Sequence, residues 1–213
     1  MTECICETIG ANPSVVRLCE EHHVYKRGDK RLTSVHGVLK VWPVKSSWED
    51  KGPWVDARVA NARDRGREVD ALLSAWLSGA LEEIPAGTRE DVKELFMQIV
   101  PWWQHRFAGV EAKAQVILAD EDIAGTADIV ILSGDEIWDL KCVSELQQKY
   151  QLQLGAYCTL YEAQYGRTPK RCGVIHVKKD REPKLVPYDP FIVASEFRIV
   201  REMWKLVKRK SRE

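Results

Sequence analysis

The chain has 213 residues, of which 45% are apolar and 30% charged, and its 32 basic residues balance its 32 acidic ones. This composition is typical of a globular domain with a buried core, and the balanced charge excludes a histone-like polycation. The sequence contains no run of about 18 apolar residues, which is the length needed to cross a membrane. Met1 is followed by polar and cysteine residues rather than by an apolar signal core. The sequence therefore predicts a cytoplasmic protein without a membrane partner.

Residues 1–30 hold a cluster of side chains that commonly bind zinc. The candidates are Cys4, Cys6, Cys19 and His22, with His23 as an alternative to His22. The pattern C-x-C-x12-C-x2-H resembles a compact zinc knuckle, in which three thiolates and one imidazole surround a structural Zn²⁺. The competing interpretation is a frayed terminus with free thiols. We expect a small zinc-knuckle-like segment over 1–30 and a second unit over 31–213.

Apolar periodicity and turn residues divide the rest of the chain into helices and strands. In chain order we expect a strand or short helix entry over 31–41, a loop over 42–54, a helix over 56–81, a helix over 89–107 that Pro101 interrupts, strands over 113–118, 123–132 and 136–142, a helix over 145–165 that ends at Gly166, strands over 171–178 and 184–187, and a helix over 190–208. This order predicts an α/β fold with a central mixed β-sheet flanked by helices.

The chemistry of the chain is concentrated in the three-strand meander. The turn at 133–135 allows two hairpin registers, which place Asp128 opposite either Asp139 or Lys141. Side chains alternate along a strand, so in both registers these three charged residues share one face, while the apolar residues between them point to the other. Three charged groups on one face of a packed sheet indicate a functional site, and an internal ion pair is the alternative.

The charged trio suits a metal-assisted reaction. Two carboxylates this close repel each other unless a divalent cation lies between them, and carboxylate oxygens suit Mg²⁺ or Mn²⁺. The backbone carbonyl of Leu140 could supply a further oxygen ligand. Lys141 is a poor metal ligand when charged, but it suits holding an attacking water or offsetting the charge of a phosphorane-like transition state. Together these groups predict hydrolysis of a phosphodiester.

These residues resemble the PD-(D/E)XK nuclease superfamily, and within it the RecB-like branch, which includes phage recombination exonucleases and CRISPR-adaptation nucleases. The core signature, an Asp followed on the next strand by Asp/Glu-x-Lys, is matched by Asp128 and by residues 139–141. The branch adds a Gln-x3-Tyr pair on the following helix, matched by Gln153 and Tyr157, and a glutamate before the first Asp, matched by Glu111. The matching segment covers less than half of the chain.

The helix expected over 56–81 departs from the branch at one position. Its sequence RGREVDALLSAWLSG aligns with an Arg-Gly-x-x-x-His motif but has Asp70 at the histidine position. The resemblance implies that Asp70 replaces a nitrogen ligand with an anionic oxygen, which shifts the metal preference from Mn²⁺ towards Mg²⁺. The alternative is a surface carboxylate paired with Arg67. Gly66 in the same motif is expected to let the helix lie close to the sheet.

The resemblance implies a restriction-endonuclease-like core for residues 31–213 and a metal-dependent DNA nuclease, with an exodeoxyribonuclease of phage or bacterial recombination or repair favoured. Its implied metal ligands are Asp70, Glu111, Asp128, Asp139 and the Leu140 carbonyl. Lys141 would position the water, while Gln153 and Tyr157 would orient the DNA strand or the lysine. Tyr150 shares their helical stripe by its i, i+3, i+7 spacing, and an ordinary amphipathic seam is the alternative for that stripe.

DNA is the expected partner, with its phosphates held by basic residues of 167–184 and of the tail over 201–213. A recombination partner protein or a homo-oligomer is a further candidate. One alternative function is a non-catalytic DNA- or protein-binding module with a zinc knuckle, which the intact Asp/Asp/Lys trio argues against. Another is an iron–sulfur nuclease, which needs a cysteine cluster after the Gln-x3-Tyr helix, where only Cys158 and Cys172 lie.

Overall fold

The computed structural model describes residues 15–19, 21–22, 24–42 and 53–210. Two of the predicted zinc ligands, Cys4 and Cys6, lie outside these ranges, as does His23, the alternative fourth ligand. Most of the loop expected over 42–54 also lies outside them.

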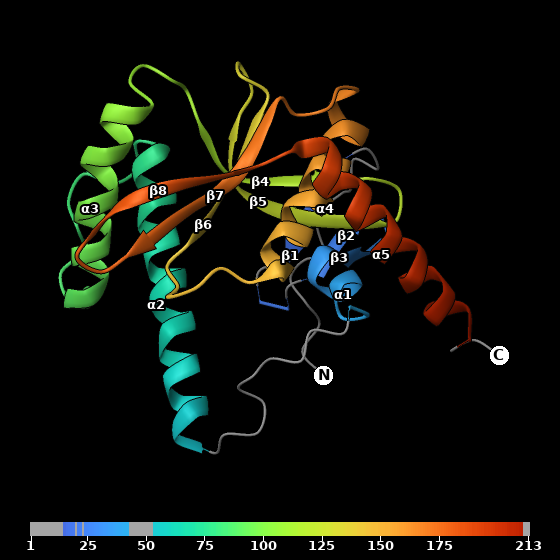
Figure 1. The fold of residues 1–213 in the computed structure, drawn as a ribbon, viewed down its shortest axis with the longest axis horizontal. Coiled ribbons are helices and arrows are strands. Elements are labelled where there is room, and N and C mark those ends of the chain that lie inside the picture. Colours follow the sequence, from blue (N-terminus) through green and yellow to red (C-terminus); the bar gives the residue numbers. More distant parts are fainter. Residues whose placement is uncertain (1–14, 20, 23, 43–52, 211–213) are drawn as a thin grey trace.

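Eight strands and five helices make up the described part of the chain (Figure 1). The strands are β1 Val16–Cys19, β2 Val24–Arg27, β3 Lys30–Ser34, β4 Lys113–Ala119, β5 Ile123–Ile131, β6 Glu136–Lys141, β7 Arg171–Lys178 and β8 Arg181–Tyr188. The helices are α1 Val35–Leu39, α2 Pro53–Leu77, α3 Glu90–Arg106, α4 Gln148–Tyr165 and α5 Pro190–Lys210. From α2 onward the predicted kinds and order of elements are confirmed, with ends that shift by a few residues.

The region before α2 is richer in structure than the sequence predicts. β1 and β2 form an antiparallel hairpin inside the segment expected to be only a zinc knuckle. The segment 31–41 contains both of its expected alternatives, because β3 passes directly into α1, where the Ser34 hydroxyl caps the helix by accepting from the Gly37 N–H. α2 begins at Pro53, inside the expected loop, since proline suits the first turn of a helix.

The expected interruption of the second long helix at Pro101 is wrong, because α3 runs through it. A proline inside a helix removes one backbone donor and leaves the carbonyl four residues earlier without its partner. Here that carbonyl belongs to Met97, and both Met97 and Pro101 are exposed. Water can therefore satisfy the carbonyl, which lowers the cost of the proline.

The strands form one mixed sheet in the order β1-β2-β3-β5-β6-β7-β8, with β4 paired to β5. The β3–β5 and β6–β7 pairs are parallel and the others antiparallel. β5 is the branch point: β4 pairs along one of its edges, while β3 pairs at 123–124 and β6 at 129–131 along the other. On that second edge, residues 125–128 lie between the two partner strands.

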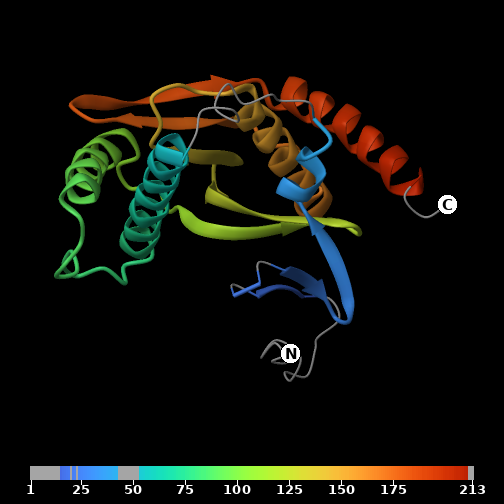
Figure 2. The ribbon, with the colours of Figure 1, turned by 90° about the horizontal axis from the view of Figure 1, so that it is seen from below.

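The sheet lies between two helical layers (Figure 1, Figure 2). One face packs against α1, α4 and α5 in a core that includes Ala127, Val130 and Ile137. The opposite face packs against α2 and α3 in a second core that includes Trp138 and Leu140. The expected mixed α/β fold with a central sheet flanked by helices is therefore confirmed.

Glycine sets the distance between α4 and α5. A Cβ at Gly155 would lie 2.0 Å from the carbonyl oxygen of Val193, so only glycine permits this approach. At Gly66 a Cβ would have no atom of the described residues within 4 Å, so the expectation that this glycine brings α2 close to the sheet is wrong. α2 packs instead through buried side chains such as Val69 and Leu73.

Among the described residues, none of the helices combines the length and apolarity that crossing a bilayer requires.

Candidate active site

The hairpin of β5 and β6 adopts the first of the two possible registers. Ile129 pairs with Trp138 and Ile131 with Glu136, so Asp128 follows opposite Asp139. Trp138 and Leu140 of β6 face the α2–α3 core, as expected from the strand alternation. The carboxylates therefore point to the face that α4 covers.

Three oxygen atoms converge on the ammonium group of Lys141. Its Nζ lies 2.5 Å from Asp139 Oδ2 and 3.8 Å from Asp128 Oδ2, and it donates a hydrogen bond of 3.2 Å to the Leu140 carbonyl. Asp128 Oδ2 also accepts a hydrogen bond of 2.9 Å from the Leu140 N–H, which fixes this carboxylate against β6. The predicted trio is thus a contiguous cluster.

Burial makes this cluster electrostatically unusual. Asp139 is fully buried, and burial raises the pKa of its carboxyl group to about 7, with the charge of Asp128 adding to the shift and Lys141 opposing it. Burial alone would lower the pKa of Lys141, but the carboxylates of Asp139 and Asp128 outweigh it and raise that pKa. Perturbations of this kind occur both in active sites and in structural ion-pair networks.

Asp70 reaches the same neighbourhood from α2. Burial raises the pKa of its half-buried carboxyl group to about 8, with further contributions from the charges of Asp128 and Asp139. Its Oδ2 accepts a hydrogen bond of 2.7 Å from the side-chain amide of Gln115 on β4. Asp70 is therefore held by a glutamine and faces the cluster, rather than pairing with Arg67, whose ion pair is with Asp64 at 3.7 Å.

Gln115 itself is strained and was not expected to matter. Its neighbours Ala114 and Val116 pair with Ile129 and Ala127 of β5, so Gln115 lies level with Asp128. Its φ of 50° lies in the left-handed region that a non-glycine residue adopts rarely and at a cost of about 1–2 kcal/mol. This conformation takes Gln115 out of the regular strand alternation, and its amide reaches Asp70.

The structure does not bring Glu111 to this cluster. Glu111 is exposed and precedes β4, whose first residue Lys113 pairs with Val130. Gln115 is the residue level with Asp128, and Glu111 lies four residues before it. Glu111 is therefore displaced from the carboxylates towards the β5–β6 turn.

The Gln-x3-Tyr pair lies on α4 beside the cluster. The Gln153 amide donates a hydrogen bond of 2.8 Å to the Tyr157 hydroxyl, and Tyr157 is buried. Burial, followed by the negative charges of Asp128 and Asp139, raises the pKa of Tyr157. One turn earlier, the Tyr150 ring lies 5.3 Å from Lys141 Nζ in a cation–π contact. The expected stripe is thus present, and it faces the charged trio.

Cations that the sequence did not single out lie next to this stripe. The pKa of Lys149 is lowered by burial and by the positive charges of Arg63 and Lys141, which places all three within electrostatic reach. Arg63 comes from α2 and Lys149 from the first turn of α4. Lys149 Nζ also lies 5.4 Å from the Tyr150 ring, the ring that contacts Lys141.

Three basic residues at the start of the segment expected to hold phosphates are paired with carboxylates. Asp135 forms ion pairs with Arg167, at 2.5 Å, and with Lys170, at 3.1 Å, while Glu136 pairs with Arg171. Glu136 begins β6 and Lys141 ends it, so these pairs lie about 16 Å from the cluster along the strand. They stabilise the base of the β5–β6 turn.

Two of the predicted zinc ligands lie in the described part of the chain. Cys19 Sγ and His22 Nδ1 are 3.5 Å apart, and the contact with Cys19, together with Glu21, raises the pKa of His22. Within the described residues, no group of three or more His, Cys, Asp or Glu side chains is arranged to hold a metal ion. The structure therefore does not show the zinc knuckle.

The acidic cluster nevertheless suits a hard divalent cation. Among the described residues, both carboxylate oxygens of Asp139 are buried without a hydrogen-bond partner, and the Lys141 ammonium is their counter-charge. A buried anionic oxygen of this kind is stabilised by a bound cation, and carboxylate and carbonyl oxygens are ligands that Mg²⁺ and Mn²⁺ accept. Asp128, Asp139 and the Leu140 carbonyl supply such oxygens on one side, with Asp70 nearby.

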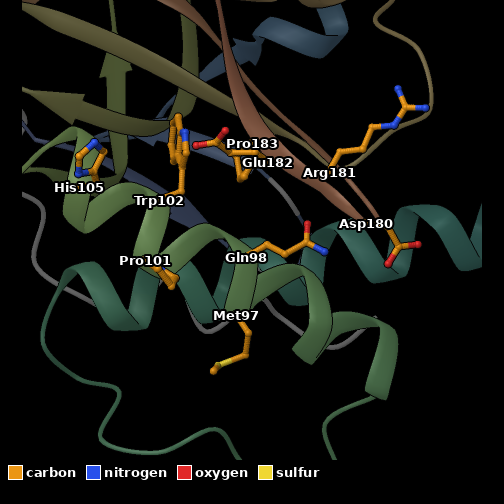
Figure 3. A pocket seen from close by; sticks show the side chains of 9 residues that line it. All are labelled: Met97, Gln98, Pro101, Trp102, His105, Asp180, Arg181, Glu182 and Pro183. Atoms are coloured by element: carbon orange, nitrogen blue, oxygen red, sulfur yellow. The ribbon is translucent and has the colours of Figure 1, made fainter.

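The hollow shown in Figure 3 is a separate feature. It has a volume of about 550 Å³ and lies between the outer side of α3 and the β7–β8 turn. Trp102, Pro101 and Met97 contribute its apolar wall, and none of the predicted site residues lines it. The hollow is therefore separate from the candidate active site.

Comparisons with known proteins agree with the fold and the motif. A family model described as the PD-(D/E)XK nuclease superfamily matches residues 26–210, so the chain belongs to this superfamily. No curated protein sequence matches the chain.

Solved structures were also compared with the chain. An inferred exonuclease from Eubacterium rectale is 16% identical, with 84% of this chain and 80% of that chain covered and a TM-score of 0.55, which shows a shared fold. A phage-related exonuclease from Haemophilus somnus 129PT is 15% identical. The match covers 84% of this chain and 96% of that chain, with a TM-score of 0.40. LHK-Exo in complex with dAMP is 14% identical, with 84% and 93% covered and a TM-score of 0.36.

Proposed function

We propose that the protein is a metal-dependent exodeoxyribonuclease that hydrolyses phosphodiester bonds of DNA in phage or bacterial recombination or repair. The observation that carries this proposal is the convergence of Asp128, Asp139 and the Leu140 carbonyl on the Lys141 ammonium. Membership of a nuclease superfamily supports the reaction class. The choice of an exonuclease and of DNA rests on the RecB-like motifs. The predicted cytoplasmic location stays a prediction.

In this proposal Asp128, Asp139 and the Leu140 carbonyl hold Mg²⁺ or Mn²⁺, and Asp70 completes the anionic side of the site. When bound, the cation would offset the charge that develops on the phosphate and lower the pKa of a bound water. Binding it would also relieve the repulsion between the carboxylates of Asp128 and Asp139.

Lys141 is proposed to position the attacking water and to offset negative charge in the transition state. Burial and its ion pair with Asp139 fix the ammonium in place, so little reorganisation is needed during the reaction. The Tyr150 ring stabilises the same ammonium from α4. Gln153 and Tyr157, which hydrogen-bond each other, orient the lysine side of the site or the DNA strand.

Gln115 is proposed to fix the carboxylate of Asp70. Its amide donates to Asp70 Oδ2, and its strained backbone lies level with Asp128. Gln115 therefore fixes the position of the Asp70 carboxylate relative to that of Asp128. Lys149 and Arg63 are proposed to contact DNA phosphates beside the site, because both positive charges lie within electrostatic reach of each other, and Lys149 also within reach of Lys141.

We also propose a structural Zn²⁺ bound by Cys4, Cys6, Cys19 and His22 in a segment over 1–30, with the nuclease domain over 31–213. The proximity of Cys19 and His22 supports half of this site. A non-catalytic binding module remains the alternative function, and the intact charged trio disfavours it.

The test of this function is the degradation of end-labelled linear and circular duplex DNA with Mg²⁺, with Mn²⁺ or with EDTA. We expect cleavage of linear DNA with either metal and survival of circular DNA. Asp139→Ala and Lys141→Ala should each reduce the rate at least about 100-fold, as expected for a lost metal ligand or transition-state cation. Glu90→Ala and Lys93→Ala, an exposed ion pair on α3, are matched controls that should retain wild-type rates.

Wild-type turnover in Asp139→Ala or Lys141→Ala would contradict the catalytic assignment. Rapid nicking of circular DNA would instead indicate an endonuclease built on the same site.

A further inference from the structure

The strand that carries Asp128 has an interrupted ladder at that residue. On one edge of β5, β3 pairs up to Ala124 and β6 pairs from Ile129 onward, so within the described sheet the residues between them have no ladder partner on that edge. On the other edge, β4 pairs with Ala127 and with Ile129 but skips Asp128. Backbone pairing therefore does not fix Asp128 directly, and its position depends on side-chain contacts such as the hydrogen bond from the Leu140 N–H.

Two tyrosines hold β5 just before Asp128. A Cβ at Gly125 would lie 2.9 Å from Cε1 of Tyr157, so the ring of Tyr157 packs directly on the strand from α4. At the next residue, the Thr126 hydroxyl shares a hydrogen bond of 2.9 Å with the hydroxyl of Tyr25 on β2. The β1–β2 hairpin lies on the opposite side of β4 and β5 from α4 (Figure 2). Adjacent residues of β5 are thus held from both sides, as the alternation along a strand allows.

Tyr25 is itself held firmly. It is 2% exposed and pairs with Leu32 in the β2–β3 ladder. Together with Leu32, Ala119 and Ala124 it forms a small core that the hairpin shares with β4 and β5. Burial raises the pKa of Tyr25, so its hydroxyl stays protonated at neutral pH. The hydroxyl is therefore a fixed hydrogen-bonding group at the end of a rigid side chain.

The contact lies close enough to the site to affect it. Thr126 precedes Asp128 by two residues, which is about 7 Å along a strand. A shift of β5 at Thr126 would move the Asp128 carboxylate relative to Asp139 and the Leu140 carbonyl. Removing a group that orients a metal ligand commonly lowers metal affinity or activity about 10–100-fold. Tyr157 already belongs to the predicted site, whereas Tyr25 was not among the predicted site residues.

We propose that Tyr25 is a positioning residue of the nuclease site, which acts through Thr126 to hold β5 and so keeps the Asp128 carboxylate in place for the metal. This inference rests on the proposed function. It makes the amino-terminal hairpin part of the site, although Tyr25 does not touch the metal. The competing explanation is a buried hydroxyl pair that only stabilises the fold, and it predicts that metal affinity follows stability.

The first test is titration of the DNA-free full chain with Mn²⁺ by calorimetry, in which binding that Asp128→Ala abolishes is assigned to the site. Tyr25→Phe and Thr126→Val should each raise the Mn²⁺ dissociation constant at least about tenfold. The double variant should bind no more tightly than either single variant, because all three lack the same contact. Circular dichroism checks that every variant is folded.

Urea denaturation of the same proteins separates positioning from stability. Each single variant leaves one hydroxyl without its partner and should unfold at lower urea, whereas the double variant removes both hydroxyls and should return towards the wild type. Tyr165→Phe is the matched control: this tyrosine lies at the end of α4 with its ring 4.6 Å from that of Tyr161, and its loss of a hydroxyl should leave Mn²⁺ binding unchanged.

A double variant that regains wild-type Mn²⁺ affinity together with its stability overturns the proposal, as do single variants with an unchanged dissociation constant. In cleavage assays, Tyr25→Phe should raise the Mg²⁺ concentration for half-maximal rate about tenfold and leave the KM for DNA at saturating Mg²⁺ unchanged. A higher KM with an unchanged Mg²⁺ requirement also overturns it. A wild-type chain that binds Mn²⁺ through Asp128 but cleaves no DNA would contradict the nuclease function alone.

Discussion

Replacing Asp139 with asparagine should make the fold more stable while it removes the chemistry. In the native chain the Asp139 carboxylate is fully buried and lies opposite Asp128, and among the described residues the donor that approaches it is the Lys141 ammonium at Oδ2. Its ion pair with Lys141 compensates only part of the cost of burial, as the raised pKa of about 7 indicates. Asparagine keeps the shape of the side chain and removes this charge.

The size of the gain follows from the pKa shift. The pKa of this carboxyl group is 3.8 in the unfolded chain and about 7 in the folded protein. Its contribution to the free energy of unfolding is therefore greatest at low pH, where the group is protonated. That contribution is lost as the pH rises from about 4 to 7. Above pH 7 the full shift corresponds to about 4 kcal/mol. The attraction of Lys141 is already contained in this shift, but the asparagine amide is itself a polar group whose burial costs free energy, which offsets part of the gain. We therefore expect Asp139→Asn to be about 2–4 kcal/mol more stable at pH 8.

Urea denaturation in EDTA, at pH 8 and at pH 4, measures this effect. The variant should unfold at higher urea than the wild type at pH 8 and at nearly the same urea at pH 4, because the wild-type carboxyl group is protonated there. Asp122→Asn is the control, since Asp122 is exposed and its hydrogen bond from Lys30 lowers its pKa. A variant less stable than the wild type at pH 8, or equally stabilised at both pH values, would refute the reasoning.

Three further predictions concern Gln115, Asp70 and the amino-terminal segment. Gln115→Gly should raise the free energy of unfolding by about 1 kcal/mol, because its φ of 50° suits glycine, yet lower Mg²⁺-supported cleavage at least about tenfold; loss of both stability and activity would contradict it. Asp70→His should improve cleavage with Mn²⁺ relative to Mg²⁺, and an unchanged ratio would return Asp70 to a purely structural role. Purified protein should contain about one Zn²⁺ per chain. Removing it should make residues 1–25 more sensitive to proteases, while Mg²⁺ still supports some DNA cleavage. A zinc content below about a tenth of an equivalent would favour free thiols instead.

The charged trio could be predicted from the sequence because its arrangement depends only on strand alternation. Both possible registers of the β5–β6 hairpin place Asp128, Asp139 and Lys141 on one face, so the uncertain turn did not affect the prediction. The order of elements after α2 was predictable for a similar reason, since long periodic segments outweigh errors at their ends. Neither argument needs contacts between distant residues.

The features that were missed depend on such contacts. Gln115 sits in a strand, and nothing in the local sequence signals its left-handed backbone or its bond to Asp70, 45 residues earlier. The basic residues near Arg167 look available in the sequence, but Asp135 neutralises two of them across the fold. β1 and β2 are four residues each, too short for periodicity to reveal.

The branching of β5 also has a consequence for how the chain reaches its native state. β4, β5 and β6 lie within fewer than 30 consecutive residues and can form as a local meander. β3 joins β5 across about 90 residues, through only two ladder pairs, Thr33 with Ile123 and Ser34 with Ala124. Closing so long a loop costs entropy that few contacts repay until the helices have packed. We therefore expect the meander to fold first and to set the carboxylates in register, and the amino-terminal strands to dock later and to detach first when the protein opens locally.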